Sequence, residues 1–134
     1  MRLSIEPMIA RPDMPLRTFA EAVELVRKAA HPGVTLTYDT GHLTAMGDPL
    51  LESFVEAYSD ISVVQLADMP GRVEVGGGEI DFAPILAHAI RCGYAGLIDL
   101  EHDWTNPGAN GERQGLERLA ATDAAARRLA GAIG

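Results

Sequence analysis

The sequence predicts an α/β fold in which four parallel strands alternate with four helices, within a single domain over residues 1–134. Four short apolar runs rich in β-forming residues alternate with longer segments of helical periodicity. The connections between these segments are short, and such alternation is typical of parallel strands covered by helices. The length of 134 residues also fits one domain with a core of its own.

The first βα unit begins with a short alternating run at residues 3–6, which predicts a strand. A proline-containing loop is expected over residues 9–17. Thr18 and Glu21 have the spacing of a capping box, so a helix is expected to begin after Thr18. The Pro-Gly pair at residues 32–33 is expected to end that helix.

The other three units follow the same plan. Their strands are expected at residues 34–38, 61–66 and 96–100. Their helices are expected from Asp48-Pro49 to Tyr58, from Asp81 to about residue 92, and over residues 113–132. The third unit also carries a long polar loop with Arg72 and three consecutive glycines, Gly76 to Gly78. Such a glycine run allows a loop to turn back, and it lacks the Lys-Ser/Thr that would complete a phosphate-binding loop.

Each predicted strand ends close to a side chain with an oxygen that can bind a metal. These side chains are Glu6, Asp39, Gln65 and Glu101. The carboxyl ends of parallel strands lie on one edge of a sheet, so the four side chains are expected to converge there. Three carboxylates at one point repel each other unless a cation lies between them. Oxygen ligands suit a hard divalent ion, and the pattern therefore predicts a site for Mg²⁺ or Mn²⁺.

Each of the four residues also has a purely structural interpretation. Glu6 could be a solvated strand end, and Asp39 could form a turn or cap a helix. Gln65 could hydrogen-bond a loop backbone, and Glu101 could form an ion pair with Arg72 or Arg113.

Two further side chains near this edge are candidates for contact with a substrate. His42 follows Asp39 by three residues, and we expect it to contact substrate or to support a metal ligand. Arg72 could hold a carboxylate, phosphate or hydroxyl of a substrate, or it could pair with Glu74 or Glu79. Trp104 could close over a substrate or cap a helix layer.

The composition narrows the expected partners and location. The formal net charge of −8 opposes phosphate backbones and anionic lipids, so neither nucleic acid nor a membrane is expected as a partner. No apolar run approaches the roughly 20 residues of a membrane span, and Glu6 interrupts the apolar N-terminus. The single cysteine, Cys92, permits no internal disulfide and is expected to be buried. We therefore expect a cytoplasmic protein.

Four sequence motifs resemble the C-terminal half of the xylose-isomerase-like TIM barrels. They are IEP at residues 5–7, YDTGH at 38–42, VQLADMPGRVEVGGGEIDF at 64–82 and GYAGLIDLEH at 93–102. This superfamily of sugar isomerases and epimerases includes hydroxypyruvate isomerase and the ketose 3-epimerases. The third motif is the most specific and is similar to hydroxypyruvate isomerase, whereas the region of the second is closer to inositol-related and sugar-phosphate members.

The resemblance implies an isomerase or epimerase acting through a cis-enediolate on a small hydroxy-ketone, hydroxy-aldehyde or hydroxy-keto acid. It implies that Glu6, Asp39, Gln65 and Glu101 hold one divalent metal, with Glu6 and Glu101 as the acid/base pair. It also implies that His42 and Arg72 orient the substrate. Many members have histidine where Gln65 stands, so Mn²⁺ or Mg²⁺ is expected here, with Co²⁺ or Zn²⁺ as alternatives.

The resemblance covers only four of the eight βα units of a TIM barrel. A half barrel leaves two sheet edges and an apolar face uncovered, so we expect self-association, with two copies forming an eight-stranded assembly as one arrangement. The alternative to an enzyme is a non-catalytic half barrel that binds a metal or sugar, or that pairs with a partner half. A hydrolase like the apurinic-site endonucleases of this superfamily fits poorly, because those enzymes use several zinc ions and many histidines, whereas this acidic chain has four histidines.

Overall fold

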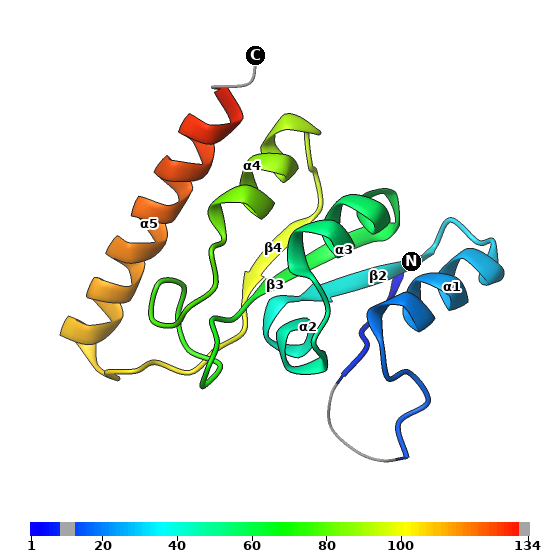
Figure 1. The fold of residues 1–134 in the computed structure, drawn as a ribbon, viewed down its shortest axis with the longest axis horizontal. Coiled ribbons are helices and arrows are strands. Elements are labelled where there is room, and N and C mark those ends of the chain that lie inside the picture. The colour runs from blue at the N-terminus through cyan, green and yellow to red at the C-terminus, as the bar shows by residue number, and fades with distance from the viewer. Residues whose placement is uncertain (9–12, 132–134) are drawn as a thin grey trace. The chain divides into compact units, whose positions relative to one another are not determined.

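The structure, a computed structural model, describes residues 1–8 and 13–131 (Figure 1). Its strands are β1 (Leu3–Ile5), β2 (Val34–Asp39), β3 (Ile61–Leu66) and β4 (Leu97–Leu100). Its helices are α1 (Phe19–Ala29), α2 (Thr40–Met46), α3 (Leu50–Ala57), the 3-10 turn η1 (Tyr58–Asp60), α4 (Ala83–Arg91) and α5 (Ala109–Gly131).

The predicted fold class is confirmed. The strands form one open, parallel sheet in the order β1-β2-β3-β4, and helices separate successive strands along the chain. Leu3 is the register partner of Val34, and Asp39 is the register partner of Gln65. Among the described residues, β1 and β4 form the two edges of this sheet.

The chain divides into two compact units. The first unit comprises Met1–Gln65 with Ala95–Asp99, and the second comprises Leu66–Tyr94 with Leu100–Gly134. The first unit therefore contains nearly all of the sheet together with α1, α2 and α3, whereas the second contains α4, α5 and the long loops that follow β3 and β4.

The core of the first unit is built around Tyr38 of β2. Its ring makes edge-on contacts with Phe19 of α1 and Phe54 of α3, at centroid distances of 5.6 and 5.0 Å. All three side chains are buried, and the Tyr38 hydroxyl donates a hydrogen bond of 2.7 Å to the carbonyl of Leu50. These contacts pack α1 and α3 against β2.

The predicted capping box at the start of α1 is present. The Thr18 hydroxyl accepts a hydrogen bond from the amide of Glu21, and the Glu21 carboxylate accepts one from the amide of Thr18. The helix ends at Ala30, which adopts the left-handed conformation with φ 46°. The Pro-Gly pair at residues 32–33 therefore lies in the turn after the helix instead of ending it directly.

Three helix predictions differ from the structure. No helix was predicted at α2, whose seven residues include a glycine. Helix α4 begins at Ala83, two residues after the predicted cap, although Asp81 still accepts a hydrogen bond of 3.1 Å from the Ala83 amide. Helix α5 begins at Ala109, four residues before the prediction. The predicted end of that helix at residue 132, and residues 9–12 of the predicted loop, lie outside the described residues.

The expectation that Cys92 is buried was wrong. Cys92 is exposed at the C-cap of α4, with its sulfur 3.4 Å from Nε2 of His88. The buried residues of α4 are Ile85, Leu86, Ala87 and Ala89, and Cys92 lies beyond them at the end of the helix. Within residues 1–8 and 13–131, no helix has both the length and the apolar character needed to cross a membrane.

Candidate active site at the strand ends

Three of the predicted site residues gather in the first unit, at the carboxyl ends of β1 and β2. Glu6 follows β1, Asp39 is the last residue of β2, and His42 lies in the first turn of α2. Each offers one oxygen or nitrogen atom that could bind a metal, and these three atoms lie within 4.8 Å of one another. Asp39 is fully buried, and the other two are mostly buried.

Asp39 brings His42 into the cluster by capping α2. Its Oδ1 accepts a hydrogen bond of 2.7 Å from the His42 amide, which satisfies one of the unpaired N–H groups of a helix start. The structural alternative for Asp39, a helix cap, is therefore correct, and the same bond holds His42 beside the strand end. The His42 Nε2 atom lies 3.7 Å from Oε1 of Glu6.

Polar contacts just behind the cluster fix the strands that carry it. The hydroxyl groups of Ser4 and Thr37 are 2.7 Å apart and join β1 to β2 on the face that Glu6 and Asp39 share. The Thr40 hydroxyl donates to the backbone carbonyl of Gln65 at 3.3 Å, which joins the start of α2 to β3.

Gln65 also lies at this edge, directly beside Asp39 in the sheet register. Its side-chain oxygen is buried and has no hydrogen-bond partner among the described residues. A buried polar atom left without a partner costs about 1–3 kcal/mol, so such an atom calls for an explanation such as a bound ion or water. Two carboxylates, one imidazole and one unsatisfied amide oxygen form a donor set that fits a divalent cation.

Glu101 and Arg72 belong to the second unit, where they face each other. The Arg72 guanidinium lies 3.5 Å from the Glu101 carboxylate, whose side chain is 49% exposed. The Glu101 amide donates to the carbonyl of Leu66 at 3.3 Å, which fixes the segment after β4 to the last residue of β3. Arg72 and Arg113 were the two partners considered from sequence for Glu101. In the structure Glu101 pairs with Arg72, whereas Arg113 pairs with Glu117.

The loop that carries Arg72 is organised by Asp68, a residue that the sequence analysis did not single out. Asp68 is fully buried, and its carboxylate accepts hydrogen bonds from four backbone amides at 2.8–2.9 Å. The donors are the amides of Met69, Gly76, Gly78 and Ile80. A Cβ atom on Gly78 would lie only 2.5 Å from Oδ1 of Asp68, so the loop requires glycine there. The glycine run thus turns the loop around a carboxylate of the chain itself.

Glu74 is a second buried carboxylate that the sequence analysis did not identify as important. It is 2% exposed and accepts hydrogen bonds from the Thr105 amide at 2.9 Å, from the Thr105 hydroxyl at 2.6 Å and from the Arg118 guanidinium. Burial by itself would raise the pKa of the carboxyl, but the hydrogen bonds from Thr105 and Arg118 outweigh burial and lower the pKa to about 2. The sequence feature that could have indicated this role for Glu74 is its position just before a glycine run.

Trp104 packs against α5 within the second unit. A Cβ atom on Gly115 would lie 2.4 Å from the Trp104 ring, and the ring of His102 meets that of Trp104 edge-on at 4.8 Å. Of the two roles considered from sequence, the structure therefore supports the second, in which Trp104 covers a helix layer.

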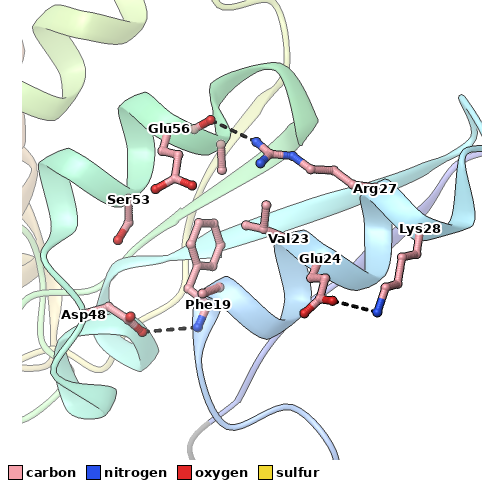
Figure 2. Close-up of a pocket in the computed structure, with 10 residues that line it drawn as sticks. Phe19, Val23, Glu24, Arg27, Lys28, Asp48, Ser53 and Glu56 are labelled. Atoms are coloured by element: carbon pink, nitrogen blue, oxygen red, sulfur yellow. Dashed lines mark hydrogen bonds and ion pairs between the residues drawn. The ribbon is translucent and has the colours of Figure 1, made fainter.

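A separate groove of about 430 Å³ lies on the helices of the first unit (Figure 2). Its apolar floor contains Phe19 and Val23 of α1, and charged side chains including Arg27 and Glu56 line its rim. None of the predicted site residues lines this groove, so it is not the candidate active site.

Comparison with known proteins identifies relatives by family and by fold. The family model described as xylose isomerase-like TIM barrel matches residues 1–122. No curated protein matches the chain in sequence.

Three solved structures illustrate the likeness in fold. An L-ribulose 3-epimerase is 19% identical with a TM-score of 0.79, and the match covers 99% of this chain and 50% of the epimerase. A family 2 AP endonuclease from Brucella melitensis is 26% identical with a TM-score of 0.77, covering 90% and 46%. An IOLI protein with a bound zinc atom is 22% identical with a TM-score of 0.69, covering 95% and 49%. The chain thus spans about half the length of each of these proteins.

Proposed function

Because the chain belongs to the xylose isomerase-like TIM barrel family, we propose that it is a sugar isomerase or epimerase acting on a small hydroxy-ketone or hydroxy-aldehyde. The observation that carries the proposal is the cluster of Glu6, Asp39 and His42 at the carboxyl ends of parallel strands, where barrel enzymes hold their active sites. The likeness to a sugar epimerase supports the substrate class.

We infer that Glu6, Asp39 and Gln65 are ligands of one divalent cation, with Glu101 as the predicted fourth ligand. The buried, unsatisfied oxygen of Gln65 supports this assignment independently of the family. When bound, the cation would polarise a carbonyl and the adjacent hydroxyl of the substrate. The oxygen-rich donor set favours Mn²⁺ or Mg²⁺, while the zinc atom of one related structure keeps Zn²⁺ as an alternative for testing.

We propose that Glu6 and Glu101 are the acid/base pair. One carboxylate removes a proton from the substrate carbon next to the carbonyl, which gives a cis-enediolate, and the other returns a proton. His42 lies 3.7 Å from Glu6, and Arg72 lies 3.5 Å from Glu101, so each carboxylate has beside it a group that can hydrogen-bond substrate oxygens. His42 and Arg72 would therefore orient the substrate.

The proposal is tested by exchange of a substrate proton with solvent. The protein is incubated with Mn²⁺ in deuterated water with a panel of ketoses and hydroxypyruvate, and deuterium incorporation is followed by mass spectrometry. We expect incorporation into at least one substrate, and its loss in Glu101→Gln. Glu117→Gln is the matched control, because Glu117 is an exposed carboxylate on α5 paired with Arg113. No incorporation across the panel would contradict the proposed activity.

We also propose that two copies of the chain assemble through their sheet edges. Leu97 and Ile98 of the edge strand β4 are 59% and 45% exposed. Because successive strand residues point to opposite faces of a sheet, this strand exposes apolar side chains on both of its faces. A two-fold axis parallel to the strands would place β4 of each copy beside β1 of the other. All strands then remain parallel, and both exposed edges are covered at once.

A non-catalytic half barrel is the second candidate. The observation favouring it is that the chain spans only about half of its relatives, since it covers 45%, 50% and 46% of three similar structures. In that case the strand-end cluster would bind metal or sugar without turnover. Mn²⁺ binding in the absence of any deuterium incorporation would favour this candidate.

A further inference from the structure

We propose that Glu74 is a positioning residue that sets Arg72 beside Glu101 by tying together the loops that carry them. The inference rests on the proposed function, in that Arg72 and Glu101 are taken as active-site groups, but the tie itself is a property of the structure. Glu74 acts through the backbone of its own loop and through Thr105.

The Arg72 loop is a tight hairpin whose base lies next to Glu74. Asp68 and Val73 exchange two backbone hydrogen bonds, of 2.8 and 2.9 Å, and Arg72 lies at the tip with φ 53°. A positive φ is uncommon for a residue other than glycine and persists only where its surroundings impose it. The direction of the Arg72 side chain therefore depends on how the hairpin is held.

The segment after β4 runs beside this hairpin. The Asp103 amide donates to the Arg72 carbonyl at 2.9 Å, and Val73 and Asp103 form an isolated parallel bridge. Glu74 then accepts two hydrogen bonds from Thr105, two residues beyond Asp103. Together these bonds align residues 72–74 with residues 103–105, and this register places the Arg72 guanidinium 3.5 Å from Glu101.

A carboxylate is required at position 74 because all three of its partners are donors. The amide and hydroxyl of Thr105 and the guanidinium of Arg118 each need an acceptor. Glutamine would present an NH₂ group to at least one of these donors and would leave the Arg118 charge without its buried partner. Glu74→Gln thus weakens the hydrogen bonds that join the two loops, with almost no change in side-chain volume.

The first measurement does not depend on turnover. The Arg72 Nε–H resonance in the NMR spectrum of the protein is assigned by its disappearance in Arg72→Lys. The response measured is the change in its chemical shift on Glu101→Gln, which reports the Arg72–Glu101 pair. We expect a clear response in the wild-type background and none in the Glu74→Gln background. Thr105→Val, which removes only one hydrogen bond to Glu74, is expected to reduce the response and serves if Glu74→Gln fails to fold.

The second measurement is the split between kcat and KM for proton exchange. Misplacement of reacting groups by about 1 Å can cost about 100-fold in rate, so kcat in Glu74→Gln is expected to fall by about that factor while the protein stays folded. Glu21→Gln is the matched control, because Glu21 also accepts backbone hydrogen bonds but caps α1 in the first unit.

The two measurements separate the inference from the proposed function. If the wild type shows no exchange, the proposed activity fails and the NMR response alone decides the role of Glu74. If folded Glu74→Gln keeps both the wild-type NMR response and wild-type kcat, the positioning role is overturned.

Discussion

The His42 Nε2 atom lies 3.7 Å from Oε1 of Glu6, and the His42 amide is bound by Asp39 at 2.7 Å. One histidine thus joins the ends of two neighbouring strands, with its backbone held by one carboxylate and its ring facing the other. In this arrangement the ring could serve as a metal ligand or as a contact to substrate. The two roles predict different effects of a His42 substitution on metal affinity and on substrate affinity.

Replacing His42 with glutamine distinguishes these two roles. Since we propose that His42 orients substrate, His42→Gln is expected to raise KM about 10-fold, as for loss of one good hydrogen bond of about 1.4 kcal/mol. The Kd for Mn²⁺, measured by titration calorimetry, is expected to change less than KM. A Mn²⁺ affinity that falls more steeply than substrate affinity would instead make His42 a ligand.

A pair of substitutions at Asp39 separates helix capping from metal binding. Asparagine caps helices about as well as aspartate, so Asp39→Asn is expected to keep the stability of the metal-free protein but to weaken Mn²⁺ binding. Asp39→Ala loses both roles and is expected to cost about 1 kcal/mol of stability in addition. Urea unfolding and Mn²⁺ titration of both variants check this, and unchanged Mn²⁺ affinity in Asp39→Asn would remove Asp39 from the ligand set.

Gln65→Leu tests the meaning of the unsatisfied oxygen. Without metal, leucine removes a buried polar atom that has no partner, so the free energy of unfolding is expected to stay equal or to rise by about 1 kcal/mol. With Mn²⁺ at 100 times the wild-type Kd, wild type should gain about 2.7 kcal/mol and the variant much less. Equal stabilisation of both proteins by Mn²⁺ would show that Gln65 is not a ligand.

The buried carboxyl of Glu74 predicts a pH dependence of stability. Its pKa is lowered from the ordinary 4.5 to about 2, so it stabilises the folded state above pH 4.5, and that contribution is lost as the pH falls toward 2. The difference in unfolding free energy between wild type and Glu74→Gln should therefore be largest above pH 4.5 and shrink toward pH 2. Parallel stability curves over this range would mean that the carboxyl is not tied as described.

The exposed edge of β4 predicts the assembly state. Light scattering at micromolar concentration is expected to give a dimer for wild type and a monomer for Ile98→Lys, because a buried lysine charge disrupts an edge-to-edge pairing. Leu25→Lys is the control, since Leu25 is 44% exposed on α1 rather than on a strand edge. A monomeric wild type would contradict the proposed pairing.

Most of the fold could be predicted because local signals agreed with it. The strand at Ile61–Leu66 was predicted at its observed bounds, and the Thr18–Glu21 capping box was recognised from four residues. Helix α2 was missed because its residues Thr40–Met46 lack a strong periodic pattern. Its start depends on the Asp39 cap, which the sequence alone did not distinguish from a turn.

The candidate site was predicted in part for the same reason. The period of a βα unit was enough to propose that Glu6 and Asp39 lie at one edge of a sheet, and the register that pairs Asp39 with Gln65 agrees with that placement. The buried carboxylates Asp68 and Glu74 escaped prediction because acidic residues in a glycine-rich loop are usually solvated. Their burial is tolerated because Asp68 accepts four hydrogen bonds from backbone amides and Glu74 accepts three from Thr105 and Arg118.

The sequence by itself determined the alternation of strands and helices, the family and the polar residues that lie at or next to the end of each strand. These depend on short-range patterns, such as apolar periodicity and caps, that operate within a few residues. The tertiary structure alone decided that His42 faces Glu6, that Arg72 faces Glu101, and that Glu74 joins two loops separated by about 30 residues of chain. Those pairings join residues that the fold brings together from distant parts of the chain, and no local sequence pattern encodes the distance between them.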